Sequence, residues 1–380
     1  MLILLLFFWL VTILYGLLLL LYRRGWQLQS DFEMPEDFVP DTQITVIIPA
    51  RNEAGNIAAC VRSVLNNDYP SSLLEIIVID DHSTDDTWEI VNGMSEGNVR
   101  CLKLAEFVDK DAQLNAYKKK AIETGIAHAA GELIITTDAD CIVPVHWLQQ
   151  IAALYQKDKP VMIVAPVAFT VNGQMVQVFQ SIDFMTMQGI TAAAHRLKMG
   201  NMSNGANLAF SRSAFLEVGG YKGVDHLASG DDYLLMMKMQ QHFPGRIAYL
   251  KSSQAIVTTA PQENWKDFLR QRIRWASKSG KYDDKKLTAV LLLVYVFNLS
   301  FVALFCLGFF DSLFWLLGIA ILLVKTALEL YFLMPVAAFF GKEKELIWFP
   351  FLQPMHILYI VSAGFLGVFG KYEWKGRKVR

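Results

Sequence analysis

Two aspartates separated by one residue, Asp138 and Asp140, follow the apolar run LIITT at 133–137. Residues i and i+2 of an extended chain point to the same side, so their carboxylates would project together, about 7 Å apart. Carboxylates this close repel each other unless a cation or a shared proton lies between them. Oxygen ligands suit Mg²⁺ or Mn²⁺, which usually complete their coordination shell with substrate phosphate. Although Asp-x-Asp also occurs in many turns, its place after an apolar strand predicts a metal site.

A second acidic pair, Asp80-Asp81, ends the apolar run LEIIVID at 74–80. The residues after it have an ordinary structural interpretation, in which Ser83 or Thr84 caps a helix and the following acids favour its positive end. That interpretation leaves Asp80 and Asp81 unexplained. Their carboxylates suit a ligand N–H or hydroxyl group.

Two later clusters allow two interpretations each. Asp231 and Asp232 are either acids in the first turn of a helix or part of a catalytic site. Gln271, Arg274 and Trp275 are spaced i, i+3 and i+4, which places them on one helical face. With the basic residues around them, they predict an amphipathic helix on anionic lipid, or a surface that binds substrate.

The elements that must position these residues alternate along the middle of the chain. We expect strands at 43–49, 74–80, 99–104 and 133–137, separated by helices at 56–65, 85–92 and 118–130. This order predicts an α/β domain with a Rossmann-like, mostly parallel sheet. Such sheets bind ligands beyond the carboxyl ends of their strands, where the acidic pairs fall. The sequence contains neither GxGxxG after the first strand nor GxxxxGK[ST], which argues against a dinucleotide-dependent dehydrogenase and a P-loop enzyme.

The two ends of the chain are apolar. Residues 2–21 carry no charge and would span about 30 Å as a helix, which is the thickness of a bilayer core. No basic residue precedes this run and Arg23-Arg24 follow it, so we expect a retained membrane anchor rather than a cleaved signal peptide. The positive-inside rule then places the following domain in the cytosol, and in a bacterium the membrane would be the inner one.

Three further apolar segments follow at 287–310, 312–340 and 346–369. The middle one contains Lys325 and Glu329, one helical turn apart, which predicts an ion pair or a position at the membrane edge because a lone charge there costs about 2.5–3.5 kcal/mol. Pro350 and Pro354 interrupt the last segment. The basic tail prefers the cytosol, whereas four spans in total would put it outside. We therefore expect two or three spans in this region.

Composition supports a membrane protein with one α/β domain. Of 380 residues, 53% are hydrophobic and 19% charged, against about 25% charged in soluble domains. The net charge of −1 argues against a nucleic-acid partner. The four cysteines are too scattered for a zinc site or a disulfide framework. The predicted organisation is an N-terminal transmembrane helix (1–22), a linker (23–41), the α/β domain (42–262), an amphipathic interface helix (263–286), a transmembrane region (287–370) and a basic tail (371–380).

Six pieces of the chain, in order and spacing, resemble family 2 glycosyltransferases of the GT-A fold. They are VIIPARNEAGNI, IIVIDDHSTDDT, KKKAIETGIAHAAGELIITTDADC, NGANLAFSRSAFLEVGGY, the Gly230-Asp231-Asp232 triplet and the Q-x-x-R-W motif at 271–275. The resemblance covers about residues 43–276 and implies a GT-A domain flanked by transmembrane helices.

The resemblance also implies roles for individual residues. Those that would bind the nucleotide-sugar donor are Pro49, Ala50, Arg51, Asn52, Glu53, Asp81, Lys118 and Asp138, with Lys118 at the diphosphate. Asp138 and Asp140 would hold the metal, and Asp232 would be the catalytic base. Those expected at the acceptor or diphosphate are Gly205, Asp231, Gln271, Arg274 and Trp275. This chain has Glu123 where the family motif has asparagine.

The function that this implies is a membrane-bound, inverting, metal-dependent hexosyltransferase. It would use Mg²⁺ or Mn²⁺ and move a sugar from a nucleotide-sugar, expected to be a UDP-sugar, to a membrane lipid or lipid-linked acceptor. The arrangement of spans is similar to that of ceramide glucosyltransferase-type members. A processive polysaccharide synthase is an alternative, because Q-x-x-R-W occurs there too. A catalytically inactive membrane scaffold of the same fold is another.

Overall fold

The computed structural model describes residues 1–94, 97–108, 115–199, 202–227, 230–277 and 284–369, together with the backbone of 372–374 and 377–379. It divides the chain into two compact units. The sheet unit comprises Ser30–Ala168 and Met202–Ala260, and the helical unit comprises Met1–Gln29, Phe169–Asn201 and Pro261–Arg380. Residues 169–201, expected inside the 42–262 domain, therefore group with the apolar helices.

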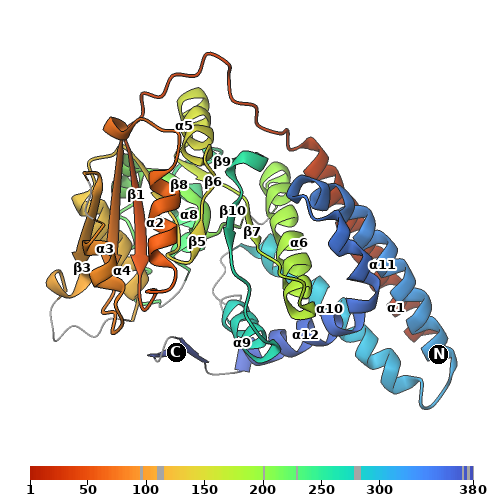
Figure 1. Cartoon of the computed structure of the whole chain (residues 1–380). Helices are drawn as coiled ribbons and strands as arrows, with labels where there is room; N and C mark the ends of the chain where they lie inside the picture. The colour runs from red at the N-terminus through yellow and green to blue at the C-terminus, as the bar shows by residue number, and fades with distance from the viewer. Residues whose placement is uncertain are drawn as a thin grey trace. The chain divides into compact units, whose positions relative to one another are not determined.

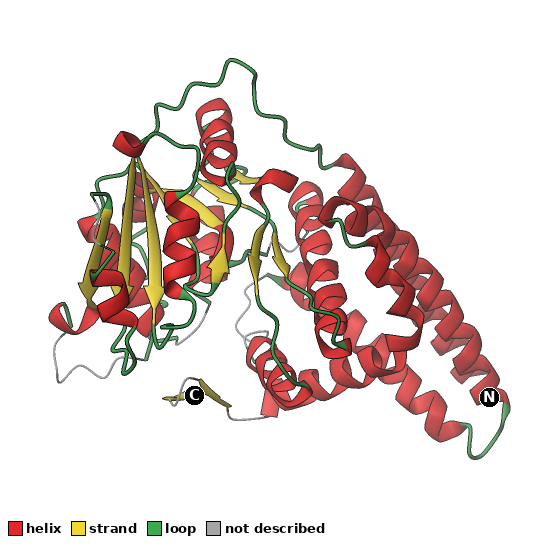
Figure 2. Ribbon diagram, in the orientation of Figure 1, coloured by secondary structure: helices red, strands yellow, loops and turns green. Residues whose placement is uncertain are grey.

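The sheet unit is built on a mixed, mostly parallel sheet of seven strands, yellow in Figure 2, in the order β3-β2-β1-β4-β8-β6-β9. The strands are β1 (Ile44–Ala50), β2 (Leu74–Asp80), β3 (Val99–Lys103), β4 (Leu133–Thr136), β6 (Met162–Val164), β8 (Leu208–Ser211) and β9 (Ile247–Tyr249). Neighbouring strands from β3 to β4 are parallel, β8 is antiparallel to both β4 and β6, and β6 pairs with β9 in parallel. The expected α/β architecture and mostly parallel sheet are confirmed.

Continuous apolar runs place β1, β2 and β4 in the core, because a strand covered on both faces must be apolar on both. The helices of this unit are α2 (Ile57–Leu65), α3 (Thr87–Asn92), α4 (Tyr117–His128), α5 (Trp147–Asp158), α7 (Arg212–Glu217) and α8 (Asp231–His242), labelled in Figure 1 where space allows. Short 3₁₀ turns lie at Ser71–Leu73, Leu104–Glu106, Gly205–Asn207 and Ser253–Ala255. A small sheet pairs β5 (Cys141–Ile142), β10 (Val257–Thr259) and β7 (Val167–Phe169).

Gly131 joins α4 to β4 at a point of close backbone approach. A Cβ atom at this position would lie 2.5 Å from the Thr45 backbone nitrogen. The Gly131 N–H donates to Thr45 Oγ1 at 2.9 Å. Glycine therefore lets the crossover helix connect to β4 directly beside β1.

The helical unit contains α1 (Leu2–Leu28), α6 (Met175–Leu197), α9 (Trp265–Ala276), α10 (Lys285–Leu307), α11 (Leu313–Phe340) and α12 (Phe349–Phe369), with a 3₁₀ segment at Glu343–Trp348 and a hairpin of β11 (Tyr372–Trp374) and β12 (Arg377–Val379). Within the described residues, four helical segments are long and apolar enough to cross a bilayer: Leu2–Leu28, Lys285–Leu307, Leu313–Phe340 and Glu343–Gly367. These segments indicate a membrane protein.

Two element boundaries in this unit differ from those expected. Helix α1 continues to Leu28 rather than ending near residue 22. Within the added part, the Arg23 guanidinium lies over the Tyr331 ring and donates to the Tyr331 carbonyl at 3.0 Å. Helix α12 continues through Pro354, so the two prolines do not break the last apolar segment. Pro350 occupies its first turn, where the missing N–H has no intrahelical partner to lose.

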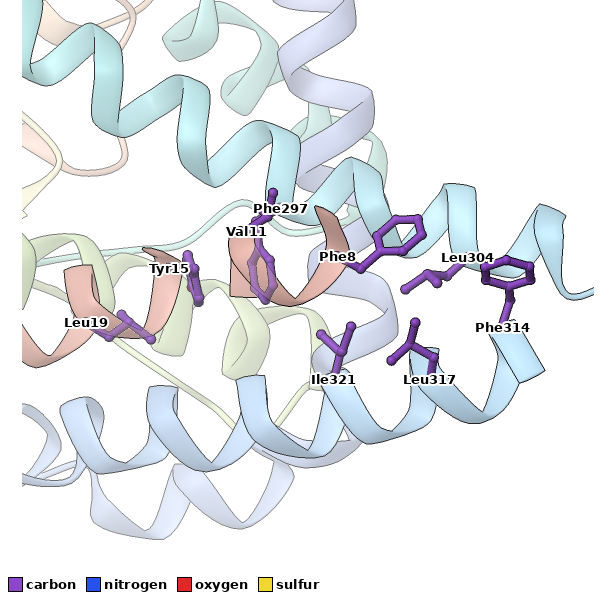
Figure 3. Packing of buried hydrophobic residues seen from close by; sticks show 9 residues of the cluster. All are labelled: Phe8, Val11, Tyr15, Leu19, Phe297, Leu304, Phe314, Leu317 and Ile321. Carbon is purple, nitrogen blue, oxygen red and sulfur yellow. The ribbon is translucent and has the colours of Figure 1, made fainter. Parts of the chain in front are cut away.

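The core of the helical unit joins α1, α10 and α11. Figure 3 shows side chains of this core between the three helices. The Tyr15 ring is stacked on Phe297, with 4.2 Å between the ring centroids. Small residues let α6 approach as well: a Cβ atom on Gly25 of α1 would lie 2.9 Å from the Ala193 carbonyl oxygen. This packing explains why α6 groups with the apolar helices.

A buried polar cluster also ties the helical unit together. Lys325 Nζ lies 2.8 Å from Glu329 Oε1, so the expected ion pair is present. Gln353 of α12 donates to Glu329 at 2.6 Å, and Tyr15 of α1 donates to the same carboxylate. The Lys325 side chain is fully buried, and the cluster satisfies its charge.

Candidate functional site

The loop after β1 and the loop after β2 are bound together beyond the carboxyl ends of these strands. Arg51 Nη1 donates to the Asp81 carbonyl at 2.8 Å and lies 3.9 Å from the Asp81 carboxylate. Asn52 adopts a left-handed φ of 52°, and its side-chain oxygen accepts from the Thr84 N–H at 2.8 Å. The structure thus brings together Arg51, Asn52 and Asp81, three of the residues expected to bind the donor. Pro49 and Ala50 end β1 directly before them.

The expected helix cap at Ser83 or Thr84 is wrong. Helix α3 begins at Thr87, and its N-cap residue Asp86 makes no side-chain capping bond. The polar side chains of this segment bind the backbone of the first loop instead. Ser83 Oγ, Thr87 Oγ1 and Asp85 Oδ2 accept from the N–H groups of Asn52, Glu53 and Ala54, at 3.0, 2.8 and 3.0 Å. The side chains of Ser83, Asp85 and Thr87 therefore bind N–H groups of the loop after β1, and neither Ser83 nor Thr84 caps α3.

Asp85 illustrates the electrostatic effect of this loop pairing. Burial opposes its charge, but hydrogen bonds from Thr87 and from the Ala54 N–H outweigh burial and lower the pKa of the carboxyl group. Asp85 therefore stays ionised at neutral pH and holds the first loop in place.

A second group of predicted residues gathers around Lys118, near the N-terminus of α4. Lys118 Nζ lies 2.6 Å from Asp138 Oδ1 and 3.2 Å from Asp231 Oδ2. Burial opposes its charge, but these carboxylates outweigh burial and raise the pKa of Lys118 above its usual value. The lysine is a fixed cation between β4 and α8.

Asp232 joins the same group through the backbone. Its Oδ2 accepts from the Gly205 N–H at 3.2 Å, and its Oδ1 accepts from the Tyr233 N–H at 2.7 Å. A Cβ atom on Gly205 would lie 3.0 Å from Asp231 Oδ2, so a larger residue would crowd this carboxylate. Five of the predicted site residues, Lys118, Asp138, Gly205, Asp231 and Asp232, therefore form one contiguous cluster.

The Asp-x-Asp pair lies in a turn and not in the expected extension of β4. Strand β4 ends at Thr136, and the Cys141 N–H donates to the Asp138 carbonyl at 3.1 Å. The Cys141 thiol lies 3.7 Å from Asp140 Oδ1, and the Cys60 thiol lies 3.4 Å from the Asp138 carbonyl oxygen. Burial raises the pKa of Cys60 to about 12.

The donor set at Asp138 and Asp140 fits an ion that shares its ligands with a substrate. Among the residues that the structure describes, no group of three or more His, Cys, Asp or Glu side chains could hold a metal ion. Two carboxylates provide hard oxygen ligands, which suit Mg²⁺ or Mn²⁺ completed by diphosphate oxygens. Asp138 and Asp140 would hold such an ion.

Two residues near this cluster were not predicted as functional. Lys119 is buried, and its Nζ donates to the carbonyls of Val224 and Leu227 at 2.9 and 2.6 Å. Glu123 accepts from the Tyr221 N–H at 3.3 Å. Both hold the segment that precedes Asp231. The sequence has three consecutive lysines at 118–120, and nothing in it shows that Lys119 is the buried one.

Gln271, Arg274 and Trp275 lie on α9, in the helical unit. The expected helix is present, with Asn264 as its N-cap: the Asn264 side chain accepts from the Asp267 N–H at 3.0 Å. The grouping of these three residues with Asp232 stays a prediction.

Two sequence-family models match the chain. The model described as "Glycosyl transferase family 2" matches residues 45–218, and that described as "Glycosyl transferase family group 2" matches residues 133–358. The second match covers more than half of the chain and extends from β4 through α9 into α12.

Curated relatives give matches of limited extent. "Probable glycosyltransferase YdaM" of Bacillus subtilis (strain 168) is 29% identical over 62% of this chain and 54% of its own. "Beta-monoglucosyldiacylglycerol synthase" of Nostoc sp. is 29% identical over 39% of this chain and 32% of its own. "Poly-beta-1,6-N-acetyl-D-glucosamine synthase" of Staphylococcus aureus (strain MSSA476) is 27% identical over 61% of this chain and 53% of its own. The chain thus spans about half the length, or less, of these relatives.

Among similar solved structures is one that matches this chain over nearly the whole length of both chains. It is a mannosyltransferase from Pyrobaculum calidifontis in complex with GDP-Man and Mn²⁺, with a TM-score of 0.58 and 20% sequence identity. The similarity covers 92% of this chain and 95% of that one. At 20% sequence identity, this similarity is evidence for a shared fold and not for a shared substrate.

Proposed function

The chain belongs to family 2 of the glycosyltransferases, and from this we propose that it transfers a sugar from a nucleotide-sugar to a lipid or lipid-linked acceptor at a membrane. Its sheet unit has the GT-A fold. The observation that supports the proposal is the cluster of Lys118, Asp138, Gly205, Asp231 and Asp232 beyond β4. In it Lys118 forms ion pairs with two carboxylates, and the third, Asp232, accepts from the Gly205 N–H. The expected donor is a UDP-sugar.

Asp232 is the proposed general base. Its carboxylate would accept the proton of an acceptor hydroxyl while that oxygen bonds to the anomeric carbon and the bond from this carbon to the diphosphate breaks. One displacement of this kind inverts the anomeric configuration. The N–H groups of Gly205 and Tyr233 hold the Asp232 carboxylate in one orientation. A positioned base contributes about 10²–10⁴-fold to the rate.

The other residues bind the donor. Arg51, Asn52, Glu53 and Asp81 would hold the nucleoside, because their two loops are bound to each other and present donors and acceptors beyond the strand ends. Lys118 would meet the diphosphate. A bound Mg²⁺ or Mn²⁺, held by Asp138 and Asp140, would stabilise negative charge on the departing nucleoside diphosphate.

The membrane supplies the acceptor in this proposal. In the part of the chain that the structure describes, four apolar helical segments flank the sheet unit in sequence. One relative is named a beta-monoglucosyldiacylglycerol synthase, and diacylglycerol is a lipid. Arg23 and Arg24 follow the first apolar segment, so the positive-inside rule favours a cytosolic catalytic domain, where nucleotide-sugars are available.

The test uses purified protein in lipid nanodiscs. Nucleotide-sugars are screened with Mg²⁺ or Mn²⁺ and a total lipid extract, and release of nucleoside diphosphate is measured. We expect release with one donor that requires metal and lipid, and a loss of about 10²–10⁴-fold in Asp232→Asn with donor binding retained. Asp140→Asn should raise the metal concentration needed for half-maximal rate. Parental release in both variants would exclude the roles proposed for Asp232 and Asp140. No release with any donor, from a folded parent, would favour the inactive-scaffold alternative.

A second candidate is repeated transfer to a growing polysaccharide. It is favoured by the match to the poly-beta-1,6-N-acetyl-D-glucosamine synthase, which extends over 61% of the chain. Product length decides between the two: a single labelled glycolipid supports single transfer, and a ladder of products supports polymerisation.

A further inference from the structure

Arg272 occupies a position within the Q-x-x-R-W run that carries no predicted role, yet it is the buried arginine of α9. Only 4% of its surface is exposed. Its Nε donates to Asp183 Oδ2 of α6 at 2.9 Å, and its Nη2 lies 2.7 Å from the same oxygen. Asp183 is 6% exposed, so the two charges form a buried ion pair within the helical unit.

The second carboxylate oxygen of Asp183 is bound by α12. Tyr359 donates its hydroxyl to Asp183 Oδ1 at 2.8 Å, and His356 Nε2 lies 3.9 Å from this oxygen. Asp183 therefore connects three helices, and its position is set by α6 and α12 together. This arrangement gives the Arg272 guanidinium a fixed counter-ion.

The other side of the Arg272 guanidinium faces the motif residues. Nη1 donates to the Gln271 side-chain oxygen at 2.9 Å, and Cζ lies 4.2 Å from the centroid of the Trp275 ring. A planar guanidinium can form an ion pair at its edge while stacking on an aromatic face, which a lysine ammonium cannot do with the same geometry. Arg272 thus contacts two of the three motif residues directly.

Apolar contacts also attach α9. Phe268, one turn earlier, is 2% exposed and packs against Phe179 and Tyr359 with ring centroids 5.4 and 5.2 Å away. Removing both partners of a buried ion pair is often neutral or stabilising, whereas removing one leaves an uncompensated buried charge. The Arg272–Asp183 pair is therefore better explained by its effect on the orientation of neighbouring side chains than by a contribution to the stability of the fold.

We propose that Arg272, fixed by Asp183, is a positioning residue that holds the Gln271 carboxamide and the Trp275 indole in the orientation used during sugar transfer. The inference rests on the proposed function and on the family resemblance, which implies that these two side chains meet the acceptor or the diphosphate. Arg272 acts through them and has no assigned contact with substrate.

The test removes both charges at once. Arg272→Met/Asp183→Asn keeps a hydrogen-bond acceptor for Tyr359 and leaves no unpaired charge. We expect the unfolding midpoint in nanodiscs to stay at or above that of the parent, kcat to fall about 10²-fold, and KM for the donor to stay unchanged. Arg270→Met/Asp267→Asn removes an exposed pair from the same helix, 66% and 43% exposed, and should behave like the parent. Parental kcat in the buried double variant would overturn the inference.

A measurement without substrate separates this inference from the proposed function. The fluorescence of Trp275 is obtained by subtracting the spectrum of a matching Trp275→Phe variant, in the parent and in the buried double variant. Removing a cation 4.2 Å from the indole shifts its emission by itself, so the readout is the polarisation of the Trp275 fluorescence. If Arg272 holds the indole, this polarisation falls when the guanidinium is removed, whether or not a donor has been found. Unchanged polarisation in the two proteins contradicts the positioning role, even if the parent is an active transferase.

Discussion

Lys118 lies between carboxylates that are distant in sequence, Asp138 after β4 and Asp231 at the start of α8. The pKa of Lys118 is raised, so its contribution to stability is complete below the pKa of an unfolded lysine, about 10.4, and is lost only as the pH rises through the higher folded value. The lysine therefore stays charged throughout the neutral range. A pH dependence of activity near neutrality must come from another group.

Lys118→Met should lower kcat/KM by about 10²–10³-fold, because it removes a preorganised cation from the position proposed for the diphosphate. The pH profile of the variant should have the parental shape between about pH 6 and 9, scaled down at every point, since Lys118 does not titrate there. The measurement is kcat/KM for the donor as a function of pH.

Lys120 offers a matched control in the same run of lysines. Its side chain is 41% exposed and lies 3.8 Å from Glu123, and surface pairs of this kind contribute little. Lys120→Met should keep nearly parental activity. A changed profile shape in Lys118→Met would instead mean that this lysine exchanges a proton during the reaction.

At the scale of elements, Gly131 determines how closely α4 and β4 approach β1. Gly131→Ala should destabilise the protein by about 1–3 kcal/mol, because the new Cβ would lie 2.5 Å from the Thr45 backbone nitrogen, which cannot rotate away. Gly55→Ala is the matched control, since a Cβ there meets nothing within 4 Å. The unfolding midpoint of each variant in nanodiscs measures the difference. Equal midpoints would show that the backbone at this crossover adjusts freely.

The elements that the sequence predicts well are those with a strong local signal. Strands β1, β2 and β4 are continuous apolar runs followed by polar residues, and each lies within one residue of its expected bounds. Strands β6 and β9 have three residues each, too few to show a period, and their place in the sheet depends on β8 and on each other. Such pairing is set by tertiary contacts.

The residues of the candidate site, like the strands, were predicted only where the sequence carries a clear motif. Spacing singled out Asp138, and the family resemblance singled out Asp232. The structure places both in the cluster that contains Lys118. Ser83 was misassigned because a local capping pattern cannot reveal a partner 31 residues away. Arg272 was overlooked because a basic helix predicts solvated charges, and only the packed helices show which arginine is buried.

At the scale of the whole molecule, the helical unit depends on the buried cluster of Lys325, Glu329, Gln353 and Tyr15. Lys325→Met should destabilise the protein by about 3–5 kcal/mol, because it leaves the Glu329 carboxylate buried without a cation. Lys325→Met/Glu329→Gln should recover most of this loss. Thermal unfolding in nanodiscs compares the two variants. A double variant as unstable as the single one would show that the loss comes from packing and not from charge.

The hydrogen bond from Tyr15 to Glu329 joins residues 314 positions apart. During synthesis, α1 is made before α11, so the Tyr15 hydroxyl meets Glu329 only after the intervening chain has been made. Until then, the Tyr15 hydroxyl must be satisfied by water, lipid headgroups or an insertion factor. An unrelated apolar helix in place of α1 would still deliver the chain to the bilayer, but it would leave Glu329 without this donor. Helix α1 thus contributes a specific hydrogen-bond donor to the helical unit as well as apolar surface.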